Sequence, residues 1–159
     1  MRLPPLTPRL LAFVIAAGVI VADQLTKWWA VATLPGDPIV VIDGFFQLRY
    51  HTNTGAAFGM FPGAGSIIAL LAVAAAVVIV LLVRELSGTL ENIAMGLVLG
   101  GAVGNLIDRV FRGDGLLDGG VVDWVDFSFF PAFNVADSAI TVGAGVAIIV
   151  AFLLEGRDG

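Results

Sequence analysis

The chain has 159 residues, of which 58% are hydrophobic and 13% are charged, and its mean hydropathy is +0.99. A soluble domain carries about 25% charged residues, so this composition excludes a water-soluble globule, a disordered chain, a collagen-like fibre and a coiled coil. The net charge of −5 comes without any block of Lys or Arg, which excludes the electrostatic footprint of a nucleic-acid partner and a polybasic lipid-binding patch.

Four apolar stretches are long enough to cross a bilayer, which takes about 20 mostly apolar residues per helix. We expect a mostly α membrane protein, with one integral membrane domain over 1–159. The transmembrane helices are predicted at about 10–29, 61–83, 92–109 and 137–154. The sequence contains no internal repeat, which disfavours a secondary transporter built from repeated halves.

The first stretch has one alternative interpretation, a cleaved signal peptide. Arg2 and Arg9 precede the apolar run, and the small residues at 30–32 are typical of a cleavage site. Asp23, Lys27 and two tryptophans lie between the run and that site, which argues against cleavage. We therefore treat the stretch as a transmembrane helix.

Asp23 and Lys27 lie four residues apart, hence on one helix face, in the far part of the predicted span. A polar residue inside a span is costly and needs a reason. Two structural alternatives are open: a local ion pair whose lysine extends outward to the interface, or a buried pair. Both are favoured over a direct catalytic role.

The predicted loop at about 30–60 contains two short β-rich runs, at 39–42 and 45–50. They flank Asp43-Gly44, a pattern typical of a hairpin, so we expect a small β-sheet in this first loop. A segment rich in small residues follows. In it, Asn53 is suited to gripping a peptide backbone and Gly55 permits close backbone approach, although a plain helix-entry turn would also explain them.

The third stretch carries glycines that favour close helix packing. Asn105 and Arg109 share one face near its far end, where Arg109 either serves a site or extends to the interface. Asp108 is expected to pair with Arg109 or to cap the next turn.

The predicted loop at about 110–134 contains Asp123, and the fourth stretch follows Asn134 and Asp137. Asp123 has a simple alternative as a solvated loop acid. Asn134 is a good helix N-cap, and Asp137 three residues later favours the helix dipole. In an up-down chain of four helices, however, all these polar segments lie on one side of the membrane, which predicts a site there.

The chemistry available at that end is limited. The chain has no cysteine and only one histidine, His51, without a serine in a nucleophile turn, and no metal-ligand motif such as HExxH. A pair of carboxylates remains, Asp123 and Asp137. Two such groups held about 3 Å apart share a proton, which suits aspartyl peptide hydrolysis without a metal or other cofactor.

The orientation of a membrane protein follows its short loops, because the cytoplasmic ones carry more Lys and Arg. In this chain the loops on the two sides of the membrane carry equal numbers of these residues. Arg2 and Arg9 flank the first helix, which usually dominates. We therefore expect both termini in the cytoplasm and the loops at about 30–60 and 110–134 on the extracytoplasmic face.

At these segments the sequence resembles bacterial lipoprotein signal peptidase, also called signal peptidase II. The matching segments, in the family's order, are 23–27, 53–58, 104–109, 121–123 and 133–138. The resemblance implies an aspartic endopeptidase of the bacterial inner membrane that has four transmembrane helices and an extracytoplasmic site. It implies cleavage of the signal peptide from diacylglyceryl-modified prolipoproteins, before the lipidated cysteine.

The resemblance also implies roles for individual residues. Asp123 and Asp137 correspond to the catalytic pair, and Asp23 and Lys27 to structural support of the site. The implied substrate-binding residues are Asn53, Gly55, Asn105, Arg109 and Asn134. Expected partners are the prolipoprotein substrate, membrane lipid and a globomycin-type inhibitor. Trp124 stands where the family suggests Phe, a change that affects only local pocket shape.

Two functions from other classes are the alternatives. An ion- or proton-coupled transporter would use Asp23, Asp123 and Asp137 as a relay. A non-catalytic assembly factor would tolerate Asp→Asn changes at positions 123 and 137.

Overall fold

The computed structural model describes residues 6–55 and 64–155. Its helices are α1 (Pro8–Thr33), α2 (Gly65–Glu85), α3 (Thr89–Phe111) and α4 (Val135–Glu155). All four are long and apolar enough to span a membrane, as predicted. The expected start of the second helix, at 61–63, lies outside the described residues.

Local capping explains why two helices begin earlier than predicted. Thr7 accepts a hydrogen bond from the Leu10 amide at 3.3 Å, and Pro8 occupies the first helical position, so α1 starts there. The Glu91 carboxylate accepts the Gly88 amide at 2.9 Å and thereby starts α3 at Thr89.

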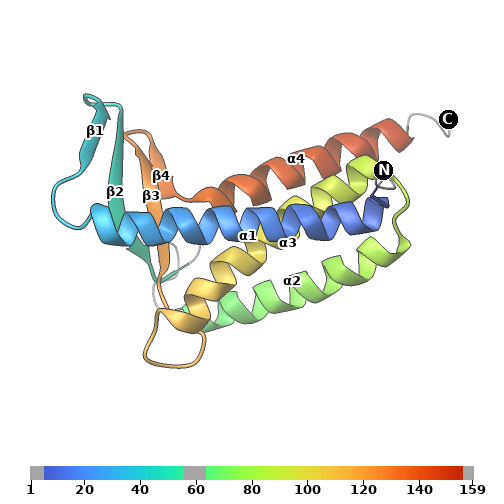
Figure 1. The fold of residues 1–159 in the computed structure, drawn as a ribbon, viewed down its shortest axis with the longest axis horizontal. Coiled ribbons are helices and arrows are strands. Elements are labelled where there is room, and N and C mark those ends of the chain that lie inside the picture. The colour runs from blue at the N-terminus through green and yellow to red at the C-terminus, as the bar shows by residue number, and fades with distance from the viewer. Residues whose placement is uncertain (1–5, 56–63, 156–159) are drawn as a thin grey trace, which may run out of the picture.

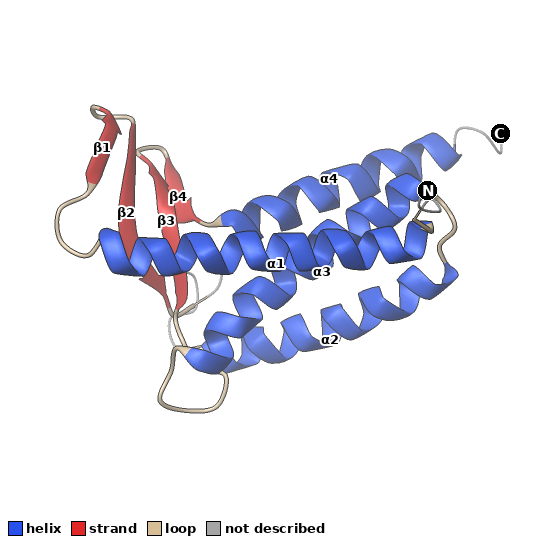
Figure 2. Cartoon of the chain, in the orientation of Figure 1, coloured by secondary structure: helices blue, strands red, loops and turns tan. Residues whose placement is uncertain are grey.

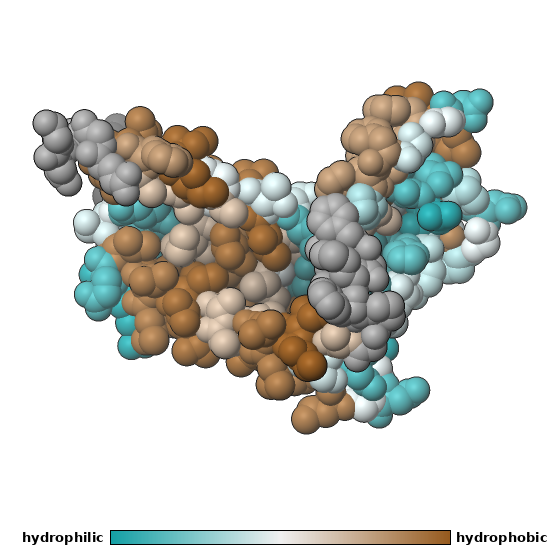
Figure 3. Space-filling model, turned by 180° about the vertical axis from the view of Figure 1, so that it is seen from behind, coloured by the Kyte–Doolittle hydropathy of each residue, from teal (hydrophilic) through white to brown (hydrophobic). Residues whose placement is uncertain are grey.

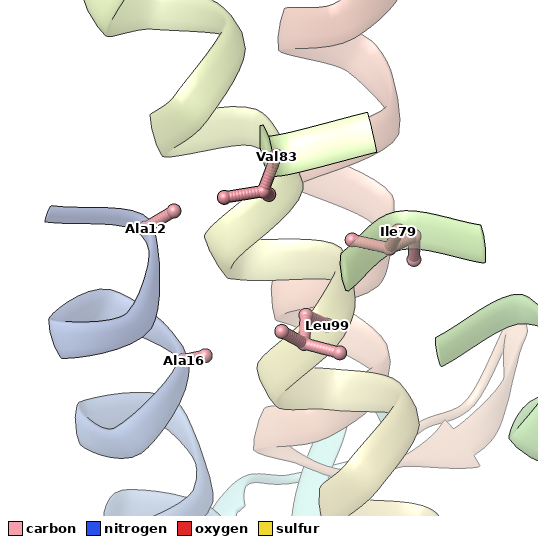
Figure 4. Close-up of a cluster of buried hydrophobic side chains, with 5 residues drawn as sticks. All are labelled: Ala12, Ala16, Ile79, Val83 and Leu99. Carbon is pink, nitrogen blue, oxygen red and sulfur yellow. The ribbon is translucent and has the colours of Figure 1, made fainter. Parts of the chain in front are cut away.

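α3 is the central helix of the bundle and packs against α1, α2 and α4, whereas α1 and α2 barely touch each other (Figure 1). Gly100 lets α1 approach α3 closely, because an added Cβ would lie 2.8 Å from the Ala16 carbonyl oxygen. A small apolar core lies near the start of α1 and the end of α2. Its residues come from α1, α2 and α3, and Leu99 of α3 lies between the other two helices (Figure 4). Its other members are Ala12, Ala16, Ile79 and Val83.

The sheet lies at one end of the bundle (Figure 2). It is antiparallel, with the order β1 (Ile39–Ile42), β2 (Phe46–Asn53), β3 (Val121–Phe127) and β4 (Phe130–Phe133). The predicted β1–β2 hairpin is confirmed, and Gly44 takes the positive φ of 65° that its turn requires.

The sequence analysis predicted a sheet in the first loop only, but the observed sheet also includes strands from the second loop. Strands β3 and β4 come from the second loop, and β2 pairs with β3 so that His51 lies opposite Asp123. This pairing joins residues about seventy positions apart, and no local sequence pattern reports it. Its consequence is that Asp123 stands on a strand and not in a solvated loop.

The ends of α1 and α3, the start of α4 and the sheet meet at one end of the molecule, as the up-down arrangement predicts (Figure 1). The start of α1, the end of α4 and the α2–α3 turn lie at the other end. Seen from behind, apolar residues dominate the helical part, whereas the sheet end carries hydrophilic residues beside exposed apolar ones (Figure 3). Many large apolar side chains of the helices are exposed, as expected for surfaces that contact lipid.

Candidate active site

Asn134 caps the N-terminus of α4 and thereby positions the first residue of the site, Asp137. Its Oδ1 accepts the Asp137 amide at 2.9 Å, and the Asp137 carboxylate accepts the Asn134 amide at 3.3 Å. These two reciprocal bonds satisfy backbone donors that a helix start leaves free, so the predicted N-cap is confirmed. They also fix the Asp137 side chain at the mouth of the bundle.

The same asparagine holds the second carboxylate. Its Nδ2 donates to Asp123 Oδ1 at 2.8 Å and to the Val122 carbonyl oxygen at 3.2 Å. Asp123 is 2% exposed. One fully buried side chain therefore contacts the first turn of α4 and strand β3 at once, and it brings Asp123 and Asp137 to a common place.

Asn105 of α3 supports the pair from the other side. Its Nδ2 donates to Asp137 Oδ1 at 2.8 Å, and its Oδ1 accepts Lys27 Nζ at 2.9 Å and Asn134 Nδ2 at 3.1 Å. Because every polar atom of this amide is engaged, its orientation is determined.

Lys27 lies beneath this layer, fully buried between two carboxylates. Its Nζ is 2.8 Å from Asp23 and 2.9 Å from Asp108. The alternative in which Lys27 extends to the interface is therefore wrong, and Lys27 and Asp23 form the buried pair of the other alternative. Asp23 also accepts the Ala136 amide at 3.0 Å, so the ion cluster anchors the start of α4.

Asp108 has different partners from those expected. It pairs with Lys27 and with Arg112 Nε at 2.8 Å, and it accepts the Val122 amide at 3.1 Å. The predicted Asp108–Arg109 pair is wrong because successive helical residues point about 100° apart and do not face each other. The role of Asp108 in tying β3 to α3 was missed by the sequence analysis.

Arg109 is 4% exposed, so the alternative in which it extends to the interface is wrong as well. Its guanidinium donates to the Gly119 carbonyl oxygen at 2.9 Å and to the Gly55 carbonyl oxygen at 2.5 Å. Arg109 thereby connects the first loop to the second. A Cβ added at Gly65 would lie 2.9 Å from Arg109 Nη1, so a side chain at this position would displace the guanidinium.

These residues border a cleft of about 530 Å³ between α2 and α4, over α3 and the sheet. Its walls are mainly apolar, and one end carries the polar groups. The structure places Asn134 behind the carboxylates, outside the lining. The sequence-predicted site residues that line the cleft are Asn53, Gly55, Asn105, Arg109, Asp123 and Asp137.

Burial raises the pKa of Asp123 from 3.8 to about 7, and repulsion by the charge of Asp137 adds to the shift. Hydrogen bonds from Asn53 and Asn134 and the charge of Lys27 act in the opposite direction. A carboxyl with this pKa carries its proton through the acidic range and gives it up near neutrality.

This shift predicts a pH-dependent stability. The folded protein holds the Asp123 proton up to about pH 7, whereas the unfolded chain loses it near pH 4, so stability falls as pH rises between these values. The slope from this group is at most about 1.4 kcal/mol per pH unit. Asp123→Asn should flatten the decline in thermal unfolding midpoint between pH 4 and 7. Equal slopes in both proteins would contradict the assignment.

Comparisons with known proteins identify the family to which the chain belongs. The family model described as Signal peptidase (SPase) II matches residues 15–153. The lipoprotein signal peptidase of Rhodococcus jostii is 43% identical over 152 residues, covering 95% of this chain and 77% of that protein. The lipoprotein signal peptidase of Shouchella clausii is 42% identical, covering 93% of this chain and 96% of that protein.

Two solved structures, each described as a bacterial membrane enzyme, share the fold. One has a TM-score of 0.80 at 32% identity and covers 92% of this chain and 90% of its own. The other has a TM-score of 0.75 at 34% identity and covers 89% and 92%. With the family model matching most of its length, this chain belongs to the signal peptidase II family.

Proposed function

We propose that the protein is an intramembrane aspartic endopeptidase that removes the signal peptide from diacylglyceryl-modified prolipoproteins and cuts before the lipidated cysteine. The observation that carries this proposal is the pair Asp123 and Asp137, held by the single side chain of Asn134 at the polar end of an apolar cleft. Family membership supports the substrate class.

The proposed reaction uses one shared proton. Asp137 accepts hydrogen bonds from the Asn105 side chain and the Asn134 amide, which hold its carboxylate in place beside Asp123, and we assign it the role of proton acceptor. Asp123, whose pKa is about 7, carries the proton. Ionised Asp137 takes a proton from water, whose oxygen attacks the scissile carbonyl carbon, while Asp123 donates its proton to the carbonyl oxygen. The tetrahedral intermediate then collapses: the C–N bond breaks, Asp137 gives its proton to the leaving nitrogen, and Asp123 takes a proton back from one hydroxyl of the intermediate.

The polar residues of the cleft are proposed to bind the substrate backbone. A transmembrane signal peptide must unwind at its cleavage point, and lipid offers no hydrogen bonds to the freed groups. Asn53, Gly55, Asn105 and Arg109 border the space where that backbone would lie. Asn134, which has no exposed atom, acts by positioning the dyad. A globomycin-type cyclic peptide would compete for the same cleft.

The proposed membrane placement rests on Arg2 and Arg9, whose positive charges before the first helix favour a cytoplasmic N-terminus. The termini face the cytoplasm and the dyad faces the extracytoplasmic side of the inner membrane. The cleft lies between the apolar surfaces of α2 and α4, where a signal peptide and its diacylglyceryl group can enter from the bilayer, so membrane lipid is the natural surrounding of the reaction.

The test is cleavage of a diacylglyceryl-modified prolipoprotein by the purified protein in detergent, with a chelator present, and with the cut located by mass spectrometry. Cleavage directly before the lipidated cysteine, blocked by globomycin, is the expected result. Cleavage elsewhere, loss of activity with the chelator, or failure to prefer the lipidated over the unlipidated substrate would each refute part of the proposal.

The dyad also predicts the pH profile. Activity requires one proton on the pair, so kcat/KM should fall as pH rises through about 7, where Asp123 loses its proton, and should fall again in acid when both groups are protonated. Initial rates of the same assay at constant ionic strength measure this. A profile that stays flat from pH 5 to 9 would speak against a shared proton.

A further inference from the structure

A second hollow lies on the helical part of the molecule, between α1 and α2 and away from the cleft of the dyad. Its volume of about 480 Å³ is within the usual range of small-ligand sites, about 300–1,000 Å³. Every lining residue is apolar. Phe13, Ala17 and Ile20 belong to the α1 wall, Val77 and Val80 to the α2 wall, and Leu99 of α3 to the floor.

The groove exists because α1 and α2 pack against α3 and hardly against each other. Small side chains keep it open, since Ala16 and Ala17 line one wall and Ala76 the other. Phe13 and Val77 are 42% and 55% exposed, so the walls face the surroundings of the bundle. In a bilayer those surroundings are acyl chains.

Each wall of the groove ends in an arginine at the same end of the bundle. Arg9 precedes Phe13 by four residues and Ala16 by seven, and Arg84 follows Val80 by four and Val77 by seven. Residues four and seven apart lie on one helix face, so both arginines continue the lined stripes. At 1.5 Å per residue, Arg9 lies about 6 Å beyond Phe13 and Arg84 about 4.5 Å beyond Leu81, both toward the end of the bundle that carries the α2–α3 turn.

The charge at this end is available to a ligand. Arg9 and Arg84 are both exposed, and neither makes an ion pair within residues 6–55 and 64–155. Two acids lie nearby in sequence. Glu91 is engaged by the Gly88 amide, and Glu85 points about 100° around α2 from Arg84. An anion between the two arginines therefore meets two positive charges.

We propose that this groove binds an anionic phospholipid, with one acyl chain between α1 and α2 and the phosphate between Arg9 and Arg84. The apolar lining matches the chain and the paired arginines match the headgroup. A second copy of the protein suits the groove less well. Copies inserted in the same direction would place their arginine ends side by side, and like charges across an interface repel.

The experiment is native mass spectrometry of the full-length protein released from detergent micelles containing phosphatidylglycerol or phosphatidylcholine with the same acyl chains. We expect one bound lipid and a preference for phosphatidylglycerol of about 25-fold, about fivefold from each arginine. Arg9→Gln/Arg84→Gln should lower phosphatidylglycerol binding to the level of phosphatidylcholine. Inorganic phosphate at matched concentration should not displace the lipid.

A matched pair of variants tests the acyl chain. Val77→Phe fills the groove and should weaken both lipids, whereas the neighbouring Val78→Phe, equally exposed but outside the lining, should not. Thermal unfolding checks that each variant folds. Equal binding of both lipids to wild type, unchanged preference in the arginine variant, equal effects of the two phenylalanines, displacement by phosphate, or a lipid-free dimer would each overturn the proposal.

Discussion

Replacing either Asp123 or Asp137 with asparagine is expected to lower kcat by about 10³-fold or more, because general acid–base groups contribute about 10²–10⁴-fold each and this pair acts as one unit. Asparagine keeps the size of the side chain but cannot take or supply the shared proton. The double variant should be about as inactive as either single variant, since removal of one member already disables the unit.

Cleavage of lipidated prolipoprotein under single-turnover conditions measures this loss. Asp126→Asn is the matched control, because Asp126 stands on the same strand three residues later and bonds to Gln47 and Arg49, away from the cleft. The control should keep near wild-type activity. If either dyad variant retained activity while folded, the catalytic assignment would fail and the transporter and assembly-factor alternatives would reopen.

Lys27→Met is expected to lower the free energy of unfolding by about 3–5 kcal/mol, the usual cost of removing one partner from a buried ion cluster. The variant leaves Asp23 and Asp108 fully buried; among the described residues Asp108 keeps its ion pair with Arg112, whereas Asp23 loses its ion-pair partner. For a chain of this size the unfolding midpoint should drop by about 6–20 °C. Thermal unfolding in detergent, followed by circular dichroism, provides the measurement.

Two further variants make this result specific to charge. Arg9→Met removes a cation from an exposed position of the same helix and should shift the midpoint little. Lys27→Met/Asp23→Asn leaves Asp108 paired with Arg112 and should recover much of the lost stability. If Lys27→Met were no less stable than Arg9→Met, the buried cluster would not be what anchors α4.

The helices could be predicted from the sequence because an apolar run of membrane length is a local signal that little else produces. The predicted ends of the helices were less accurate, because each real end depends on a single contact, such as the hydrogen bond from the Gly88 amide to Glu91. Strands β3 and β4 were missed for a different reason. Strand β3 pairs with β2, which is distant in sequence, and its buried acid Asp123 breaks the apolar pattern by which a buried strand is recognised.

The candidate site could be located from the sequence but not assembled from it. Topology predicted that Asn105, Asp123 and Asp137 meet at one end, and the structure brings them together. It did not predict that Asn134 would contact both carboxylates. Nor could it pair Asp108 with Lys27 across two helices, because the sequence offers Arg109 as the nearer cation.

The ion cluster also constrains the order in which the chain can mature in the membrane. Lys27 enters the bilayer with α1, and at that stage only Asp23, four residues away on the same helix, can neutralise it. Asp108 and Asn105 arrive with α3, some eighty residues later in synthesis, and the amide of Ala136 arrives last with α4. Asp137 therefore reaches Asp123 only when the final helix is inserted, so a partly translated chain lacks the proposed proteolytic activity.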